Sequence, residues 1–125
     1  MANKTGQKLK LLYVMNILLN ETDEEHPLNA NDIIGRLQEL GIEAERKSIY
    51  SDMEMLASYG YDIMKINGRD GGFFMGSREF DIEELEFLVH AVRSSKTMSK
   101  KKADRLIKKL TAFASEYDAD KLKRR

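Results

Sequence analysis

The amino-acid sequence predicts a mainly α-helical fold with one small β-hairpin, and two observations support this prediction. Over most of the 125 residues, apolar side chains recur with the period of about 3.6 positions that is typical of amphipathic helices. After Gly60 the period changes to two, as in strands, and helical spacing returns after residue 80. With 42% hydrophobic and 34% charged residues, the composition is that of a globular domain and not of a disordered chain.

The first helix is expected from Gly6 to Leu19. Its spacing predicts a face formed by five residues: Leu9, Leu12, Tyr13, Asn16 and Leu19. Lysines followed by the apolar run 11–19 superficially resemble a signal peptide, but no small-residue cleavage site follows. The run is also much shorter than the roughly 20 residues that cross a bilayer, so we expect a cytoplasmic protein without a membrane segment.

A second helix is expected after the polar stretch 22–27, through which Pro27 prevents a helix. Asn29 has the position of its N-cap, and Gly41 has the position of its terminator. Its apolar face consists of four residues: Ile33, Ile34, Leu37 and Leu40.

A third helix is expected from about Arg46 to Tyr59, followed by Gly60 as terminator. Three residues form its buried stripe: Ile49, Met53 and Leu56. Two short strands, 63–66 and 73–75, then flank a turn over residues 67–72 and predict the hairpin.

Two C-terminal helices complete the expected fold. Asp81 and Glu84 have the spacing of a capping box ahead of the first, whose stripe consists of four residues: Leu85, Leu88, Val89 and Val92. Ser99 caps the last helix, whose stripe is expected to extend over six residues: Ala103, Leu106, Ile107, Leu110, Phe113 and Tyr117. We expect residues 1–78 to form one domain and residues 79–125 a helical extension.

Three helices followed directly by a hairpin is the element order of a winged helix-turn-helix. In that fold the third helix can enter the major groove of DNA, and the hairpin, or wing, can contact the backbone. Seven residues of these elements are candidates for DNA binding: Arg46, Lys47, Ser48, Tyr50, Ser51, Lys65 and Arg69. We therefore expect sequence-specific binding of double-stranded DNA by a transcription regulator.

Several residues of the third helix have a second interpretation. Arg46 and Lys47 can be a solvated pair of bases on the surface of the helix. Ser48 can cap the helix locally, and Tyr50 can be half-buried by packing. Asp52 is expected to pair with a nearby base or a backbone amide and not to meet DNA. Glu43 and Glu45, just ahead of the helix, would face phosphate unfavourably.

The same segment is similar to that of a known family. Residues 46–56 (RKSIYSDMEML) and 60–63 (GYDI) resemble the recognition-helix segment of DeoR-like winged-helix regulators, most closely the bacterial WYL-domain transcription regulators. Six residues match the pattern of that family: Lys47, Ser48, Ile49, Asp52, Leu56 and Gly60. Glu45 stands where the family usually has Ser, and Ser51 where it usually has Arg, and each departure removes an expected phosphate contact.

The resemblance covers residues from about 9 to 110 and implies DNA binding and transcriptional control. Members of the family usually continue into a ligand-sensing WYL domain, for which the remaining residues leave no room. The chain is then either an N-terminal fragment or a stand-alone regulator. A small-molecule effector is expected only if a missing C-terminal domain exists.

The distribution of charge leaves a second function open. The 21 Lys and Arg balance 21 Asp and Glu, so no overall positive charge attracts DNA. Charge is nevertheless segregated, and residues 96–125 carry eleven bases against four acids. The alternative function is a protein–protein docking module on a winged-helix fold. The basic C-terminal region is either a solvated face, a homodimer contact or a flank that contacts phosphate.

No enzyme, cofactor or metal site is expected. The absence of Cys excludes thiolate metal sites and Cys nucleophiles, and two His are too few for a His-rich metal centre. His26 is expected in an exposed loop and His90 in a packing role. Glu83, Glu84 and Glu86 fall within one helical turn and are interpreted as a solvated face.

Overall fold

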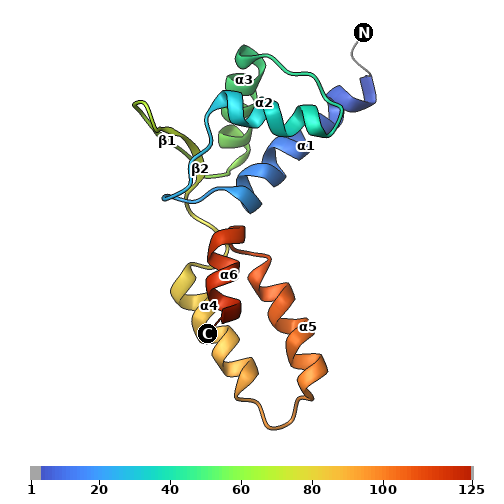
Figure 1. Cartoon of the computed structure of the whole chain (residues 1–125), viewed down its shortest axis with the longest axis vertical. Helices are drawn as coiled ribbons and strands as arrows, with labels where there is room; N and C mark the ends of the chain where they lie inside the picture. The colour runs from blue at the N-terminus through green and yellow to red at the C-terminus, as the bar shows by residue number, and fades with distance from the viewer. Residues whose placement is uncertain (1–3, 125) are drawn as a thin grey trace. The chain divides into compact units, whose positions relative to one another are not determined.

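The structure, a computed structural model, describes residues 4–124 and is mainly helical, with one two-stranded antiparallel sheet (Figure 1). The coarse fold class expected from the sequence is therefore confirmed. The elements in chain order are α1 (Lys4–Glu21), α2 (Ala30–Glu39), α3 (Arg46–Tyr59), β1 (Ile63–Ile66), β2 (Gly72–Met75), α4 (Ile82–Arg93), α5 (Lys100–Thr111) and α6 (Glu116–Arg124). The chain divides into two compact units, residues 1–76 and 77–125. Within residues 4–124, no helix is long and apolar enough to cross a membrane.

Helix α1 buries a different face from the one that its spacing predicted. Val14, Ile17 and Leu18 are buried, whereas Leu9 and Leu12 are 38% and 52% exposed. Apolar residues occur around nearly the whole circumference of the run 11–19, so spacing alone does not select one face. Contacts with α2, α3 and β2 make the selection.

Local capping chemistry determines the ends of α2 and α3 as expected. The Asp32 N–H donates to Asn29 Oδ1 at 2.8 Å, and the Asn29 N–H donates to Asp32 Oδ2 at 3.0 Å. Gly41 follows α2 with a φ of 78°, and Gly60 ends α3 with a φ of 130°, values that side chains with a Cβ rarely adopt. The stripe expected on α3 is buried.

Ion pairs join α1 to the two following helices. The ammonium of Lys10, a residue only 5% exposed, donates to the carboxylate of Asp52 on α3. This pair confirms the expectation that Asp52 is paired with a basic side chain of the protein itself. Arg36 Nε donates to Glu21 Oε1 at 2.6 Å, and this hydrogen bond raises the pKa of Arg36. Charge therefore supplements the apolar contacts that hold α1, α2 and α3 together.

The hairpin has one buried strand and one largely exposed strand. β2 is buried along its whole length, and Lys65 of β1 lies opposite Phe73 of β2. Leu28 and Phe73 exchange backbone hydrogen bonds of 2.9 and 2.7 Å, which ties the loop before α2 to β2. A Cβ on Gly72 would lie 2.5 Å from the carbonyl carbon of Leu28, so this approach requires glycine.

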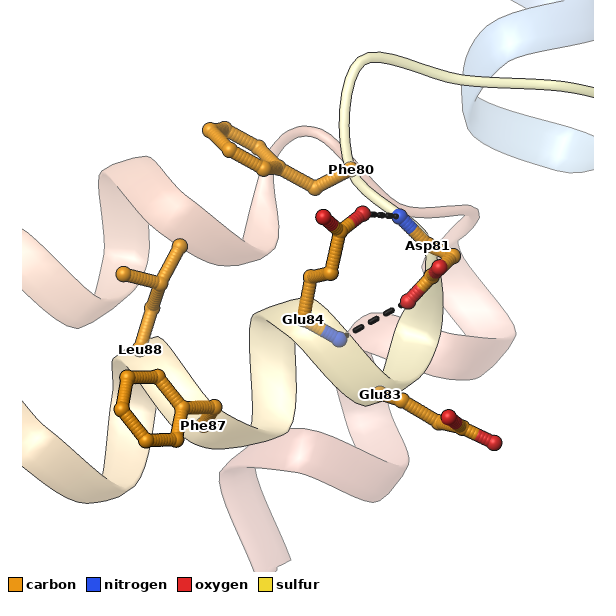
Figure 2. A pocket seen from close by; sticks show the side chains of 6 residues that line it. All are labelled: Phe80, Asp81, Glu83, Glu84, Phe87 and Leu88. Atoms are coloured by element: carbon orange, nitrogen blue, oxygen red, sulfur yellow. Dashed lines mark hydrogen bonds between the residues drawn. The ribbon is translucent and has the colours of Figure 1, made fainter.

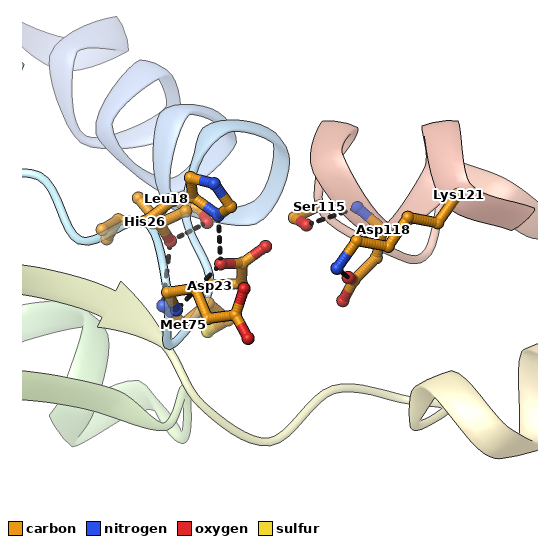
Figure 3. Close-up of polar contacts among 9 residues, drawn as sticks. Leu18, Asp23, His26, Met75, Ser115, Asp118 and Lys121 are labelled. Atoms are coloured by element: carbon orange, nitrogen blue, oxygen red, sulfur yellow. Dashed lines mark hydrogen bonds and ion pairs between the residues drawn. The ribbon is translucent and has the colours of Figure 1, made fainter.

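The end of α1 is also tied to β2 by a buried hydroxyl. Thr22 Oγ1 donates to the Leu18 carbonyl at 2.5 Å and accepts from the Met75 N–H at 3.0 Å. Next to it, His26 Nδ1 lies 2.7 Å from Asp23 Oδ1 (Figure 3). His26 therefore lies in a loop, as expected, but it is half-buried and paired, so the expectation that it is exposed is wrong.

The second unit contains three helices where two were expected. The expected last helix ends at Thr111, and a new helix begins after Ser115, which is fully buried. Ser115 Oγ accepts from the Asp118 N–H at 3.1 Å, so it caps α6 (Figure 3). Phe113 consequently leaves the expected stripe and is 43% exposed, whereas Leu122 is buried.

Helices α4, α5 and α6 contact one another around a small core of their own. Its members are Leu85, Ala114 and Leu122, packed against Phe80, Ile82 and Leu110. Arg93 Nη2 donates at 3.3 Å to each of two carbonyls at the end of α6, those of Leu122 and Lys123. Ala103, Ile107 and Thr111 of α5 are buried within this unit.

Candidate nucleic-acid interface

The first turns of α3 present polar side chains opposite their buried face. Ile49 and Met53 are buried, while Arg46, Lys47 and Ser51 are exposed. This division follows from the amphipathic spacing of the helix. Buried apolar residues therefore orient the helix so that its two bases point away from the core.

A group of four side chains, named here the basic–aromatic cluster, joins α3 to the hairpin: Arg46, Tyr50, Lys65 and Phe73. The ring of Tyr50 lies edge-on to that of Phe73, with centroids 5.7 Å apart. Lys65 Nζ lies 5.6 Å from the Tyr50 centroid and 5.7 Å from the Phe73 centroid, within cation–π range. Arg46 Nη2 donates to Tyr50 Oη at 3.4 Å. Two cations from different elements thus contact one tyrosine.

Tyr50 combines the two interpretations that the sequence left open. It packs on Phe73, yet 37% of its surface is exposed. The hydrogen bond from the Arg46 guanidinium lowers the pKa of Tyr50, because a positive donor stabilises the phenolate, and the charge of Lys65 acts in the same direction. Since the hydroxyl oxygen accepts from Arg46, its own hydrogen can be donated to an external acceptor.

Ser48 has a local role at the start of α3. Its Oγ donates to the Glu45 carbonyl at 2.8 Å and accepts from the Glu45 N–H at 3.2 Å. Gln7 Nε2 donates to the Glu43 carbonyl at 3.3 Å, which links the α2–α3 connection to α1. These bonds fix the start of α3, and they use the one hydrogen that Ser48 could donate to a ligand.

The hairpin supplies the remaining two candidates. Lys65 is brought against α3 by the basic–aromatic cluster. Arg69 is exposed in the turn between β1 and β2, where Gly68 has a φ of 110°. Phe73 was not among the candidates, although its strand alternation placed it in the hairpin. Its contact with Tyr50 depends on the tertiary structure.

Net charge differs between the two units. The first unit has 8 Lys and Arg against 12 Asp and Glu, a net charge of −4. The second has 13 against 9, a net charge of +4. Glu43 and Glu45 are exposed immediately before Arg46. The cations of the basic–aromatic cluster therefore lie on a unit that is acidic as a whole.

The second unit carries an open hollow of about 440 Å³, formed by residues of α4 and the segment before it. Its lining consists of Phe80, Asp81, Glu83, Glu84, Phe87 and Leu88 (Figure 2). The Glu84 N–H donates to Asp81 Oδ1 at 2.8 Å, and the Asp81 N–H donates to Glu84 Oε1 at 3.0 Å. Both carboxylates therefore serve to begin α4, as the capping-box spacing predicted.

The placement of the remaining acidic residues and histidines is relevant to metal binding. Among the described residues, no three His, Asp or Glu side chains are placed to hold a metal ion. His90 is exposed on α4, and its Nε2 lies 3.5 Å from Ser94 Oγ, so it does not have the packing role that was expected.

The cluster and its neighbours on α3 combine properties that suit an anionic ligand. Guanidinium and ammonium groups form charge-assisted hydrogen bonds to phosphate oxygens, and hydroxyls donate to the same oxygens or to base edges. Comparison with known protein families, with curated proteins and with solved structures finds no match for this chain.

Proposed function

We propose that this chain is a transcription regulator that binds double-stranded DNA in a sequence-specific manner, through a winged helix-turn-helix in its first unit. The observation that carries the proposal is the basic–aromatic cluster, because it unites cations of α3 and β1 at the exposed start of α3. The order of three helices and a hairpin supports it, since that order is typical of winged helices.

In this proposal α3 enters the major groove with its first turns. Arg46 and Lys47 donate to phosphates or to the O6 and N7 atoms of guanine. The hydroxyls of Tyr50 and Ser51 donate to phosphate or to a base edge. Lys65 and Arg69 of the hairpin bind the backbone at the edge of the site, while Ser48 keeps the helix start in position. Arg46 is further oriented by its bond to Tyr50, which limits the side-chain entropy lost on binding.

One observation favours a second function, a protein-docking module on the same fold. The net charge of the first unit is −4, and Glu43 and Glu45 lie exposed beside the proposed interface. Acidic residues reduce the attraction to DNA but do not oppose a protein partner with a basic surface. Docking to such a partner would use the same exposed start of α3.

Selection of bound sequences from a randomised duplex library tests the proposal. We expect the full chain to enrich one motif. The variant Arg46→Ala/Lys47→Ala should bind that motif at least about tenfold more weakly, because loss of two phosphate or base contacts costs roughly 1–3 kcal/mol each. Removal of two charges from α6, in Lys121→Ala/Lys123→Ala, is the matched control and should weaken binding by less than about threefold.

Circular dichroism of both variants verifies that the helices remain folded. If no motif is enriched by the wild type, the sequence-specific function is wrong. Equal weakening by the two variants would place the interface outside α3. Saturable binding to a protein with little dependence on salt, and none to duplex DNA, would support the docking module.

A further inference from the structure

Helix α5 separates its apolar residues from its bases. Ala103, Ile107 and Thr111 are buried, and α5 packs against α4 and α6. All six bases of this 12-residue helix are exposed: Lys100, Lys101, Lys102, Arg105, Lys108 and Lys109. At about 100° per residue, the five bases after the first fall within an arc of roughly 120° on the side away from the buried residues. They are named here the cationic face of α5.

This arrangement opposes the stability of the helix itself. Three lysines occupy the first turn, where the helix dipole disfavours positive charge, and no acid accompanies them there. Arg105 lies three or four positions from four other bases, and like charges at these spacings repel. Among residues 4–124, none of the ion pairs involves a base of α5. The structure therefore leaves this charge available for a ligand.

The chemistry of the face narrows the class of ligand. A helix that lies on a membrane inserts its apolar side into the lipid, and the apolar side of α5 is buried in the second unit. Lysine is depleted in the centres of protein–protein interfaces, where its hydration must be lost. A duplex backbone presents a regular row of phosphates that long, hydrated lysine side chains can neutralise without leaving water.

We propose that the cationic face of α5 is a second DNA-binding surface, which binds phosphates of the duplex without regard to sequence. This face supplies the electrostatic attraction to DNA that the first unit lacks, because the net charge of that unit is −4. The inference rests on the proposed function only in taking duplex DNA as the ligand. Specificity belongs to α3, whereas affinity and its dependence on salt belong largely to α5.

The test measures binding of the full chain to a labelled duplex of random sequence by fluorescence anisotropy, between about 50 and 200 mM salt. The variant is Lys101→Gln/Arg105→Gln/Lys108→Gln, in which glutamine preserves helix propensity. Each lost phosphate contact lowers the slope of log K against log salt by about 0.9, so three contacts lower it by roughly 2.7. Over that salt range the affinity of the wild type should then change roughly 40-fold more than that of the variant.

The matched control removes three charges from α6, in Lys121→Gln/Lys123→Gln/Arg124→Gln. Its slope should fall by less than about one unit. An equal fall in both variants would mean that net charge, and not the face of α5, sets the affinity. An unchanged slope in the α5 variant would also overturn the proposal.

Failure of the proposed function has a different outcome. In that case the library would show no enriched motif, while salt-dependent binding to random duplex would persist and would still require α5. Vesicles containing phosphatidylserine are the final arm. If the wild type bound these vesicles through α5 but did not bind duplex, the surface would be a membrane contact, and the inference would be wrong.

Discussion

The ion pair between Lys10 and Asp52 offers a sharp test of how α3 is held in position. The two side chains are only 6% and 16% exposed, so each charge has lost most of its hydration and depends on the other. We compare three variants: Lys10→Met, Asp52→Leu and the double variant. Methionine preserves most of the length of the lysine stem, and leucine is close to aspartate in size.

The expected magnitudes follow from burial. Removal of one partner from a buried ion pair typically lowers the free energy of unfolding by about 3–5 kcal/mol, because the other charge remains buried and unpaired. Asp52 keeps some exposure to solvent, so we expect both single variants to lose about 3 kcal/mol, near the lower value. Replacement of both partners by apolar residues is often neutral or stabilising. We therefore expect the double variant to lie within about 1 kcal/mol of the wild type, which, with two single losses of about 3 kcal/mol each, requires a coupling energy of at least about 5 kcal/mol.

Urea unfolding followed by tyrosine fluorescence is a suitable assay. The chain has no Trp, and four of its 5 Tyr lie in the first unit, so this signal reports mainly on the unit that contains the pair. The matched control is the exposed pair between Arg124 and Asp120 of α6, whose side chains are 77% and 59% exposed; because it lies in the second unit, its unfolding is followed by far-UV circular dichroism. Its double-mutant cycle should give about 0.5 kcal/mol or less. Additive effects at Lys10 and Asp52, or single-variant losses below about 1 kcal/mol, would refute the reasoning.

Three further predictions concern single residues. Gly35→Ala should raise the free energy of unfolding by about 1 kcal/mol, because Gly35 lies within α2 and an added Cβ would meet open space. Gly72→Ala should lower the free energy of unfolding, because an added Cβ would collide with the backbone of Leu28. Urea unfolding of the two variants distinguishes the two signs. Arg46→Ala should raise the pKa of Tyr50 towards its usual value of about 10, since loss of the guanidinium removes the group that stabilises the phenolate; identical tyrosinate absorbance titrations would contradict this. Ser115→Ala should lower stability by about 1 kcal/mol through loss of the α6 cap, and an unchanged thermal midpoint would show that α6 does not depend on it.

Much of the fold was predictable because its signals are local. The starts of α2, α4 and α5 and the C-terminal ends of α2 and α3 were identified from capping or terminating residues, whose hydrogen bonds reach only two to four positions along the chain. The buried stripe of α3 was predicted for the same reason, since polar residues alternate with apolar ones at helical spacing. The signal for α6 was also local, in the spacing of Ser115 and Asp118, but the apolar period through Phe113 and Tyr117 outweighed it.

The candidate interface was predictable only in part. The exposed start of α3 follows from its amphipathic pattern, and the four-residue spacing of Arg46 and Tyr50 allows their hydrogen bond. The contact of Lys65 with Tyr50 joins residues 15 positions apart and requires the hairpin to fold against α3. Spacing along one helix or strand contains no information about such a contact.

The sequence alone therefore determined the order of the elements from α1 to α5, the caps that begin α2, α4 and α5, and the exposed bases at the start of α3, all of which depend on neighbours in the chain. The tertiary structure decided which side of α1 is buried and that Lys10 pairs with Asp52 of α3. It also decided that Arg46 of α3 and Lys65 of β1 both contact Tyr50. The physical reason is that an apolar residue or a charge can be satisfied by any suitable partner, and only packing brings one particular partner within reach.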